Sequence, residues 1–409
     1  MTFTAQHQSF ENMIKLFKDP ICTYLNTATC APLLDQVQHS MMTTIRSKAN
    51  PGKMPLVDSM NSIESLRESL AQLLSVPKNS LVLVENATKG LLLILNGMIW
   101  GKGDEILIVS DSHASAFIPV FAIKERFGIV VSIIDTDKIL RCCHSDLWDY
   151  LNTVSSSKVR LIVLSHVTWN TGKILPLSVL ISWARSRKIV SVVDGAQGIG
   201  HVPISLANIG CDAYIFSGHK WLLGPSGTGA VWITPEFCDD LWPSQAGYSG
   251  VIGFTMAGKL VWRDGPSRLE TSTRSSPAIE GWITALNFIS KIGLEAIGKR
   301  IVCTSNKFRI QLNDIIRNRS DVGIVGGDAG IVTLTGNWQL LTKLDGFLSK
   351  NNVVVRLVDR PKAVRFSIHA FNSDKDIART LDLIEKFFFK HKNVFSGGES
   401  ANHSALWLE

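Results

Sequence analysis

Two residues of this 409-residue chain, a lysine and an aspartate, have sequence neighbours that are typical of a catalytic site. Lys220 lies in the run Ser-Gly-His-Lys-Trp at residues 217–221, and Asp194 follows the apolar stretch 189–193. An aspartate at the carboxyl end of a buried strand points into the crevice where open α/β sheets bind ligands. A lysine amine can form a Schiff base with an aldehyde, while a carboxylate keeps a pyridine nitrogen protonated. The pair therefore predicts the two ends of a pyridoxal 5'-phosphate (PLP) site.

Alternating strand and helix patterns from about residue 60 must position these two residues. Short apolar runs predict seven buried strands, at residues 81–84, 106–109, 129–134, 159–164, 189–193, 213–216 and 229–233. Helical segments separate most of them. Because strands buried on both faces and joined by helices form parallel sheets, the expected fold class is α/β with a mostly parallel sheet.

The pattern changes after about residue 277. A single long helix is expected from there to about residue 318, followed by strand and helix pieces and a closing helix that begins at Asp374. This α+β pattern indicates a second, smaller domain. We therefore expect an N-terminal arm at 1–20, a large domain at 21–276, a small C-terminal domain at 277–394 and a flexible tail at 395–409.

Composition excludes several classes of protein. The net charge of +7 comes from 42 basic and 35 acidic residues spread along the chain, which does not favour nucleic-acid binding. No apolar segment reaches the ~18 residues of a membrane span, and no signal-peptide pattern precedes the first strand. Seven cysteines occur without C-x-x-C spacing. A reduced cytoplasmic protein without a metal is expected.

The stretch 192–233 resembles the class V aminotransferases and cysteine desulfurases, a family of fold-type-I PLP enzymes. The resemblance extends more thinly from about residue 24 to about residue 377. Its specific part is Asp-Gly-Ala-Gln at 194–197 followed by Ser-Gly-His-Lys at 217–220, because four distinct chemical demands are met in order. The resemblance implies a large PLP-binding domain, a smaller C-terminal domain, and a homodimer with its active sites at the subunit interface.

The resemblance also implies further residues around the cofactor. Ala87 and Thr88 follow the first strand and are expected to bind the phosphate at a helix N-terminus, where the helix dipole favours an anion. The alternative is an ordinary helix cap. His113 follows the second strand and is expected to stack on the pyridine ring.

Other expected contacts reach the phenolic oxygen and the phosphate. Asn170 and Gln197 are expected to donate hydrogen bonds to the phenolic oxygen, which helps to set the pKa of the Schiff base. Ser217 and His219 flank the lysine and resemble phosphate ligands. Thr273 resembles the threonine that reaches the phosphate of the partner subunit, and its neighbour Ser272 is a rival for that role.

The substrate carboxylate has its own expected ligand. Arg365 matches the arginine that clamps the α-carboxylate in this family, and its planar fork suits that group better than a lysine does. Arg356 and Arg360 lie close by in the sequence and keep an alternative open. The resemblance implies Asn26 as a second substrate-binding residue. Three tryptophans are expected to be pocket walls or core: Trp169, Trp221 and Trp262.

One departure from the family pattern concerns the reaction. Cysteine desulfurases carry a mobile cysteine on a loop shortly before the carboxylate-binding arginine, where it takes sulfur from the substrate. Here the last cysteine is Cys303, and the connection at 355–364 is short. A thiol nucleophile has no substitute in that step. The chain is therefore more similar to the subgroup of cystine and cysteine-conjugate C–S lyases and isopenicillin N epimerase-like enzymes.

The expected reaction is α,β-elimination from cystine or a cysteine S-conjugate. Lys220, displaced from the cofactor by the substrate amine, is the expected base for the α-proton, and Asp194 keeps the ring able to accept electrons. A sulfur leaving group would then depart from the β-carbon, and pyruvate and ammonia would follow.

Several alternatives remain open. An epimerase needs an acid on the opposite face, for which Tyr248 is a candidate, and an aminotransferase of a specialised amino acid or peptide is also open. Outside these enzymes, the alternatives are a PLP-binding regulatory or assembly protein and a nucleotide-binding α/β protein. Against a nucleotide-binding protein, this chain has no G-x-G-x-x-G run after the first strand and no Walker lysine.

Overall fold

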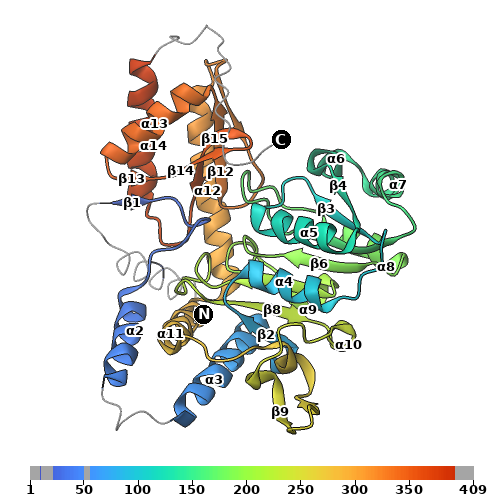
Figure 1. Cartoon of the computed structure of the whole chain (residues 1–409). Helices are drawn as coiled ribbons and strands as arrows, with labels where there is room; N and C mark the ends of the chain where they lie inside the picture. The colour runs from blue at the N-terminus through green and yellow to red at the C-terminus, as the bar shows by residue number, and fades with distance from the viewer. Residues whose placement is uncertain (1–9, 11–21, 50–55, 392–409) are drawn as a thin grey trace.

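The computed structural model describes residue 10, residues 22–49 and residues 56–391. Within these residues the chain forms a seven-stranded sheet, a four-stranded sheet and two small two-stranded ribbons (Figure 1). Apart from residue 10, the expected arm at 1–20 lies outside the described residues. The expected tail at 395–409 lies outside them as well.

The large sheet has the strand order β2-β8-β7-β6-β5-β3-β4. Its strands are β2 (Leu81–Val84), β3 (Glu105–Val109), β4 (Val130–Ile134), β5 (Val159–Ser165), β6 (Val190–Asp194), β7 (Ala213–Ser217) and β8 (Gly229–Ile233). Neighbours from β4 to β7 pair in parallel, whereas β8 pairs antiparallel with both β7 and β2. The prediction of a mostly parallel α/β sheet is confirmed.

Both faces of this sheet are buried, as its apolar strands predict. In β5, Ile162 and Leu164 belong to one hydrophobic cluster, whereas Leu161 and Val163 belong to the cluster on the other face. Successive strand side chains point to opposite faces, so two apolar layers form from one continuous run. The helices around the sheet are α2 (Asp35–Lys48), α3 (Leu56–Leu74), α4 (Ala87–Gly97), α5 (Ala114–Phe127), α6 (Thr136–Arg141), α7 (His144–Val154), α8 (Leu177–Ser186), α9 (Leu206–Ile209), α10 (Pro235–Asp240) and α11 (Ser276–Ile292).

The smaller sheet is antiparallel throughout, in the order β11-β12-β15-β14. Its strands are β11 (Val322–Val325), β12 (Ile331–Gly336), β14 (Arg356–Asp359) and β15 (Lys362–Ser367), and its helices are α12 (Leu294–Ile316), α13 (Trp338–Lys350) and α14 (Asp374–Lys390). A separate apolar cluster forms the core of this unit. The expected α+β pattern is therefore present in the C-terminal part.

The start of the chain packs on this C-terminal unit. Strand β1 (Thr23–Tyr24) pairs in parallel with β13 (Val353–Val354), so the blue N-terminal strand lies beside the orange helices in Figure 1. Asn26 then forms a parallel bridge with Ser367 at the end of β15. The segment that follows β1 is thereby held next to the strand that carries Arg365.

The expected single helix from about 277 to 318 is wrong. The chain forms two helices, α11 and α12, separated by Gly293 with φ +94° and ψ 134°. A residue with that backbone conformation cannot continue an α-helix. Helix α11 packs against α2 and α3, and α12 packs against α14. The division into domains at 21–276 and 277–394 stays a prediction.

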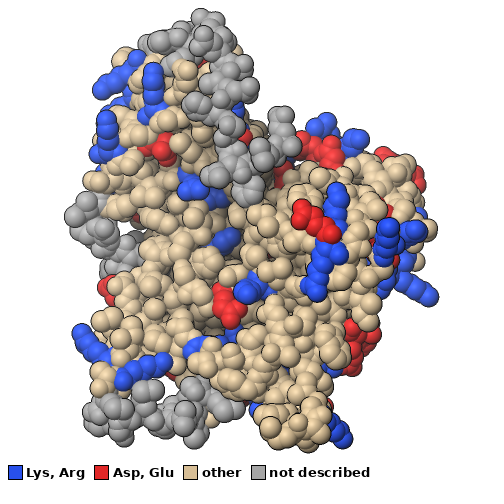
Figure 2. Space-filling view, viewed as in Figure 1, with Lys and Arg blue, Asp and Glu red and all other residues tan. Residues whose placement is uncertain are grey.

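A ribbon and the surface complete the description. Strands β9 (Val251–Phe254) and β10 (Leu260–Trp262) form an antiparallel ribbon, and short 3-10 helices span Lys78–Ser80, Tyr248–Gly250 and Gly265–Leu269. On the face shown in Figure 2, basic and acidic side chains occur in small groups, both over the part built on the large sheet and over the C-terminal part. Among the described helices, none has the length and apolar character needed to span a membrane.

Gly293 offers a test of the helix break. An added Cβ at this position meets no atom within 4 Å, so only the positive φ opposes a side chain. We expect Gly293→Ala to lower the free energy of unfolding by about 1–2 kcal/mol, measured by chemical denaturation. The matched control is Gly346→Ala within α13, where space is also open and φ is ordinary; it should be neutral or stabilise by up to about 1 kcal/mol. Equal effects of the two substitutions would contradict this account.

Candidate active site

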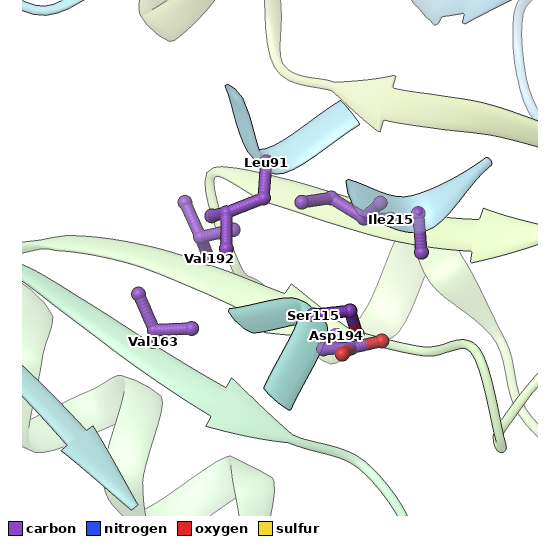
Figure 3. A pocket seen from close by; sticks show the side chains of 7 residues that line it. Leu91, Ser115, Val163, Val192, Asp194 and Ile215 are labelled. Atoms are coloured by element: carbon purple, nitrogen blue, oxygen red, sulfur yellow. The ribbon is translucent and has the colours of Figure 1, made fainter. Parts of the chain in front are cut away.

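The carboxyl ends of three neighbouring strands form the floor of the site. Strands β5, β6 and β7 end at Ser165, Asp194 and Ser217, and Asp194 extends into the crevice between them. The Ala196 N–H donates to Asp194 Oδ1 at 2.9 Å and orients the carboxylate. Figure 3 shows this carboxylate beside Ser115 of α5, next to a small pocket. The pocket is lined by Ala87, Leu91, Ser115, Val163, Val192, Asp194 and Ile215.

Lys220 and Asp194 interact electrostatically across this crevice. Burial lowers the pKa of Lys220 to about 8, the charges of Asp194 and Cys30 oppose that effect, and Arg365 adds to it. Burial raises the pKa of Asp194, opposed by the Ala196 N–H and by Lys220. With a pKa of about 8, about one amine in ten is neutral at pH 7, far more than at the ordinary value of 10.5, and a nucleophile or base reacts in that neutral form.

The expected phosphate residues converge at the N-terminus of α4. Asn86 is the N-cap, since its Oδ1 accepts from Lys89 N–H at 3.0 Å, and the Ala87 N–H donates to Ser217 Oγ at 3.1 Å. Ala87, Thr88 and Ser217 thus come together although they belong to distant parts of the sequence. The capping alternative and the anion-binding prediction are compatible, because both use the N–H groups at one helix end.

His113 is the N-cap of α5, two residues before Ser115, which lines the pocket with Asp194. Its Nδ1 accepts from Ser115 N–H at 3.1 Å, and its ring meets Trp169 edge to face, with centroids 5.1 Å apart. Loss of hydration around the ring lowers the pKa of His113 to about 4, and the charges of Lys220 and Arg365 contribute, although the residue is exposed to solvent in the single chain. A neutral imidazole held in this way can stack on an aromatic ring without adding charge.

Asn170 and Gln197 both contact protein groups. Asn170 Nδ2 donates to the Arg360 carbonyl at 2.8 Å, while its buried Oδ1 has no partner among the described residues. Gln197 Oε1 accepts from Trp221 Nε1 at 2.6 Å, and its Nε2 donates to the Ala28 carbonyl at 2.9 Å. Their expected contacts with the phenolic oxygen stay predictions.

Two further expected phosphate ligands have different surroundings. His219 is half-buried beside Lys220, its carbonyl accepts from Ala31 N–H at 2.8 Å, and burial lowers the pKa of its ring to about 4. Thr273 is exposed and its Oγ1 lies 2.8 Å from the Tyr248 hydroxyl. It lines a separate groove with Ser272, so the single chain does not bring it to Lys220.

Arg365 is the arginine that the fold places in the site. Its side chain is only 3% exposed, whereas Arg356 and Arg360 are exposed. Nη2 donates to Thr29 Oγ1 at 2.7 Å and to Asn26 Oδ1 at 3.3 Å, and Nη1 donates to the Trp169 carbonyl at 2.8 Å. Burial lowers the pKa of this guanidinium to about 10, which still leaves it charged at neutral pH.

Two residues near these side chains escaped the sequence analysis. Thr29 binds Arg365 directly, and Asp111 lies 3.4 Å from the Asn170 amide, with a carboxyl pKa raised by burial. The polar run Asn-Thr-Ala-Thr at 26–29 after a short strand was the available signal for Thr29. Of the expected tryptophans, Trp169 is a wall of the site and Trp221 is core. Trp262 packs against Trp242 on the ribbon.

The residues present fit PLP. Buried polar atoms without a hydrogen-bond partner in the described part of the chain include Ser112 Oγ, Asn170 Oδ1, His219 Nδ1 and Arg365 Nε. Buried polar groups are normally hydrogen-bonded, so a group of buried polar atoms without partners indicates a site for a polar ligand. The helix end at Ala87 suits a phosphate, the amine of Lys220 an aldehyde, and the carboxylate of Asp194 a pyridine nitrogen.

Comparison with known proteins finds cysteine desulfurases among the relatives of this chain. The chain is 32% identical over 246 residues to a Xylella fastidiosa protein named "Probable cysteine desulfurase", which covers 59% of this chain and 58% of that protein. It is 30% identical over 226 residues to a cysteine desulfurase of Shigella flexneri, covering 54% and 53%. The matched region thus spans less than two thirds of the length of these relatives.

Solved structures match over more of the chain. The complex of the cystine C–S lyase C-DES with its reaction product cysteine persulfide superposes with a TM-score of 0.82 at 26% identity, covering 90% of this chain and 98% of that one. A C-DES mutant with glycine covalently linked to its PLP cofactor gives a TM-score of 0.83, also at 26% identity, covering 90% and 97%. The pattern described as Aminotransferase class-V matches residues 23–380. With this match and this fold, the chain belongs to the class V aminotransferase family.

Proposed function

We propose that this chain is a PLP-dependent lyase that acts on cystine or a cysteine S-conjugate by α,β-elimination. The observation that carries the choice of reaction is the β14–β15 hairpin before Arg365. Asp359 pairs directly with Lys362, so the connection is a tight turn without cysteine, and Asn170 binds the Arg360 carbonyl in that turn. A hairpin of this kind cannot carry a sulfur-accepting thiol to the substrate.

The site residues have separate tasks in this proposal. PLP, when bound, supplies the electron sink for the charge that develops at the substrate Cα. Lys220 holds the cofactor and then takes the proton from Cα, for which its lowered pKa of about 8 is suited. Arg365 binds the α-carboxylate, and Asn26 and Thr29 orient its fork.

The remaining residues hold the cofactor. With PLP bound, Asp194 would keep the pyridine nitrogen protonated, His113 would stack on the ring, and Asn170 and Gln197 would donate to the phenolic oxygen. Ala87, Thr88, Ser217 and His219 are proposed to bind the phosphate. With the proton removed from Cα, the sulfur substituent departs from the β-carbon as a persulfide. Water then hydrolyses the remaining unsaturated amine, so cystine and one water yield cysteine persulfide, pyruvate and ammonia. The similarity to the cystine C–S lyase C-DES supports this outcome.

The epimerase alternative has less support from the residues of a single subunit. Tyr248, the candidate acid for epimerisation, is 67% exposed and its hydroxyl lies against Thr273 in the separate groove. That position keeps it away from Lys220 of its own subunit, so it reaches a site only together with Thr273, across the dimer interface proposed below. Elimination needs no second acid at Cα, because loss of the leaving group consumes the charge that proton removal creates.

We also propose that the protein is a homodimer with the two sites at its interface. Thr273 is exposed, and the neighbouring β9–β10 ribbon presents Phe254 and Met256 at 70% and 97% exposure. Exposed apolar groups of this size favour a partner surface. A second copy would cover them and bring Thr273 toward the phosphate of its partner.

Light scattering should show this dimer. Phe254→Lys should weaken the dimer and lower turnover together, because a charge would be buried at the interface. The control is Ile99→Lys, a substitution at another exposed apolar residue, 81% exposed, at the far end of α4. A fully active wild-type monomer would contradict the assembly, as would equal effects of the two substitutions.

The titration of Lys220 predicts how cofactor capture depends on pH. A neutral amine attacks the PLP aldehyde and a protonated one does not, so capture should accelerate as pH rises through the lysine pKa. We expect a midpoint near pH 8, well below the ordinary value of 10.5, in rapid-mixing absorbance measurements on cofactor-free protein. Lys220→Ala should show no covalent absorbance change at any pH. A wild-type midpoint near 10.5 would remove the argument from burial.

The reaction itself is tested with cystine. Incubation should release pyruvate and a persulfide without added keto acid, and Lys220→Ala should lower the rate by about 10²–10⁴-fold, since it lacks the base. Absence of any keto acid from all cysteine derivatives, with exchange of the α-proton instead, would favour the epimerase.

Cys30 supplies the control that separates elimination from sulfur transfer to the protein. It stands between Thr29, which binds Arg365, and Ala31, whose N–H donates to the His219 carbonyl. Cys30→Ser should keep pyruvate formation from cystine, because elimination requires no protein thiol. If turnover instead required Cys30 and released alanine from cysteine, a desulfurase reaction would replace the proposal.

A further inference from the structure

Trp221, the residue after Lys220, contacts the rings of two histidines. Trp221 is 1% exposed, and its indole stacks on the ring of His201 with centroids 3.6 Å apart and planes 4° apart. The ring of His369 lies on the indole at 5.9 Å and 22°. The two imidazoles come from different parts of the fold, since His201 follows β6 and Asp194, whereas His369 follows β15 and Arg365.

Hydrogen bonds determine the tautomer of each histidine. The Gly330 N–H donates to His201 Nε2 at 2.6 Å, so Nδ1 carries the proton and donates to the Gln197 carbonyl at 2.7 Å. His369 Nε2 lies 3.2 Å from the Trp221 carbonyl, which can only accept, so Nε2 is the protonated nitrogen. Each ring is thereby oriented by a backbone group as well as by stacking.

Both histidines stay neutral at the pH where such an enzyme works. Burial lowers the pKa of His201 to about 3 and that of His369 to about 4. Protonation of His201 at Nε2 would remove the acceptor of the Gly330 N–H, whereas for His369 burial of the ring opposes the charge. The enclosure of Trp221 is therefore insensitive to pH over the neutral range.

The indole N–H links the same residue to the N-terminal segment. Trp221 Nε1 donates to Gln197 Oε1 at 2.6 Å, and Gln197 Nε2 donates to the Ala28 carbonyl at 2.9 Å. Ala28 lies between Asn26 and Thr29, the two side chains that bind Arg365. The indole of Trp221 thus contacts Gln197 in the turn after Asp194 and His369 after the end of β15. Through Gln197 it is also linked to the segment that orients Arg365.

We propose that Trp221 is a positioning residue that holds the Lys220 amine in register with Asp194 and Arg365. Lys220 and Trp221 are joined by a peptide bond. Holding the indole in place therefore limits where the Cα of Lys220 can lie. Reaction rates fall steeply when a catalytic group is displaced by about 1 Å, and partners beyond the reacting atoms supply that precision. The inference rests on Lys220 as the lysine that binds PLP and holds for any reaction at that site.

The first experiment replaces the indole by a ring without an N–H. Trp221→Phe should keep bound cofactor but lower kcat by about 10–100-fold, with a smaller change in KM. The pH midpoint of the visible cofactor band should also move, by about half a unit or more, because the lysine environment changes. Movement of this band is a readout that loss of stability by itself does not produce.

Trp183→Phe is the matched control. Trp183 is also fully buried, and its Nε1 donates to the side-chain oxygen of Asn152 at 2.9 Å, but it lies on α8 away from the site. It should lower stability to a similar extent and leave the band and kcat unchanged. If both variants shift the band alike, or if Trp221→Phe changes neither the band nor kcat, the inference is wrong.

A second pair of variants keeps the test decisive where Trp221→Phe does not fold. His369→Gln retains an N–H that can reach the Trp221 carbonyl, whereas His369→Phe retains only a ring. We expect the glutamine variant to keep kcat within about threefold and the phenylalanine variant to lose about tenfold. Equal kcat values in the two variants would overturn the inference. Wild-type protein that shows no visible band with PLP would instead contradict the proposed cofactor site, so the two failures are distinguishable.

Discussion

Burial of the Lys220 amine beside Asp194 is the constraint on which the rest of the site depends. The parallel arrangement of β5, β6 and β7 places Asp194 at the floor of the crevice, and the loop after β7 returns the lysine to the same point. Removing the amine from water lowers its pKa, and the nearby carboxylate limits how far it falls. The balance yields an amine that is chemically available at neutral pH without leaving an unpaired charge in the core.

The second constraint is that the surroundings of Arg365 are built from two segments far apart in the sequence, one near each end of the described chain. Strand β1 pairs with β13, and Asn26 pairs with Ser367, so the N-terminal segment is part of the C-terminal unit's edge. Arg365 is consequently held by Asn26 and Thr29 on one side and by the Trp169 carbonyl on the other. An arginine fixed in this way meets a carboxylate without first losing rotamer freedom.

Local signals explain which site features were predictable. Asp194 and Lys220 stand at strand ends marked by apolar runs and small residues, and the Asn86 cap marks the start of α4 directly. The break at Gly293 was missed because both flanking segments have helical periodicity and one glycine is tolerated in many helices. Its positive φ is set by packing of α11 on α2 and α3 and of α12 on α14.

By itself, the sequence determined the α/β class, the seven strands, and the residue types that a PLP site requires. These follow from periodicity and from chemistry that each short motif carries within itself. Only the tertiary structure decided that Arg365, and neither Arg356 nor Arg360, is buried in the site. It also decided that Thr29 binds Arg365 and that Gln197 holds Trp221. Such pairings join residues far apart in the chain, and no local pattern encodes which distant backbone will lie beside a given side chain.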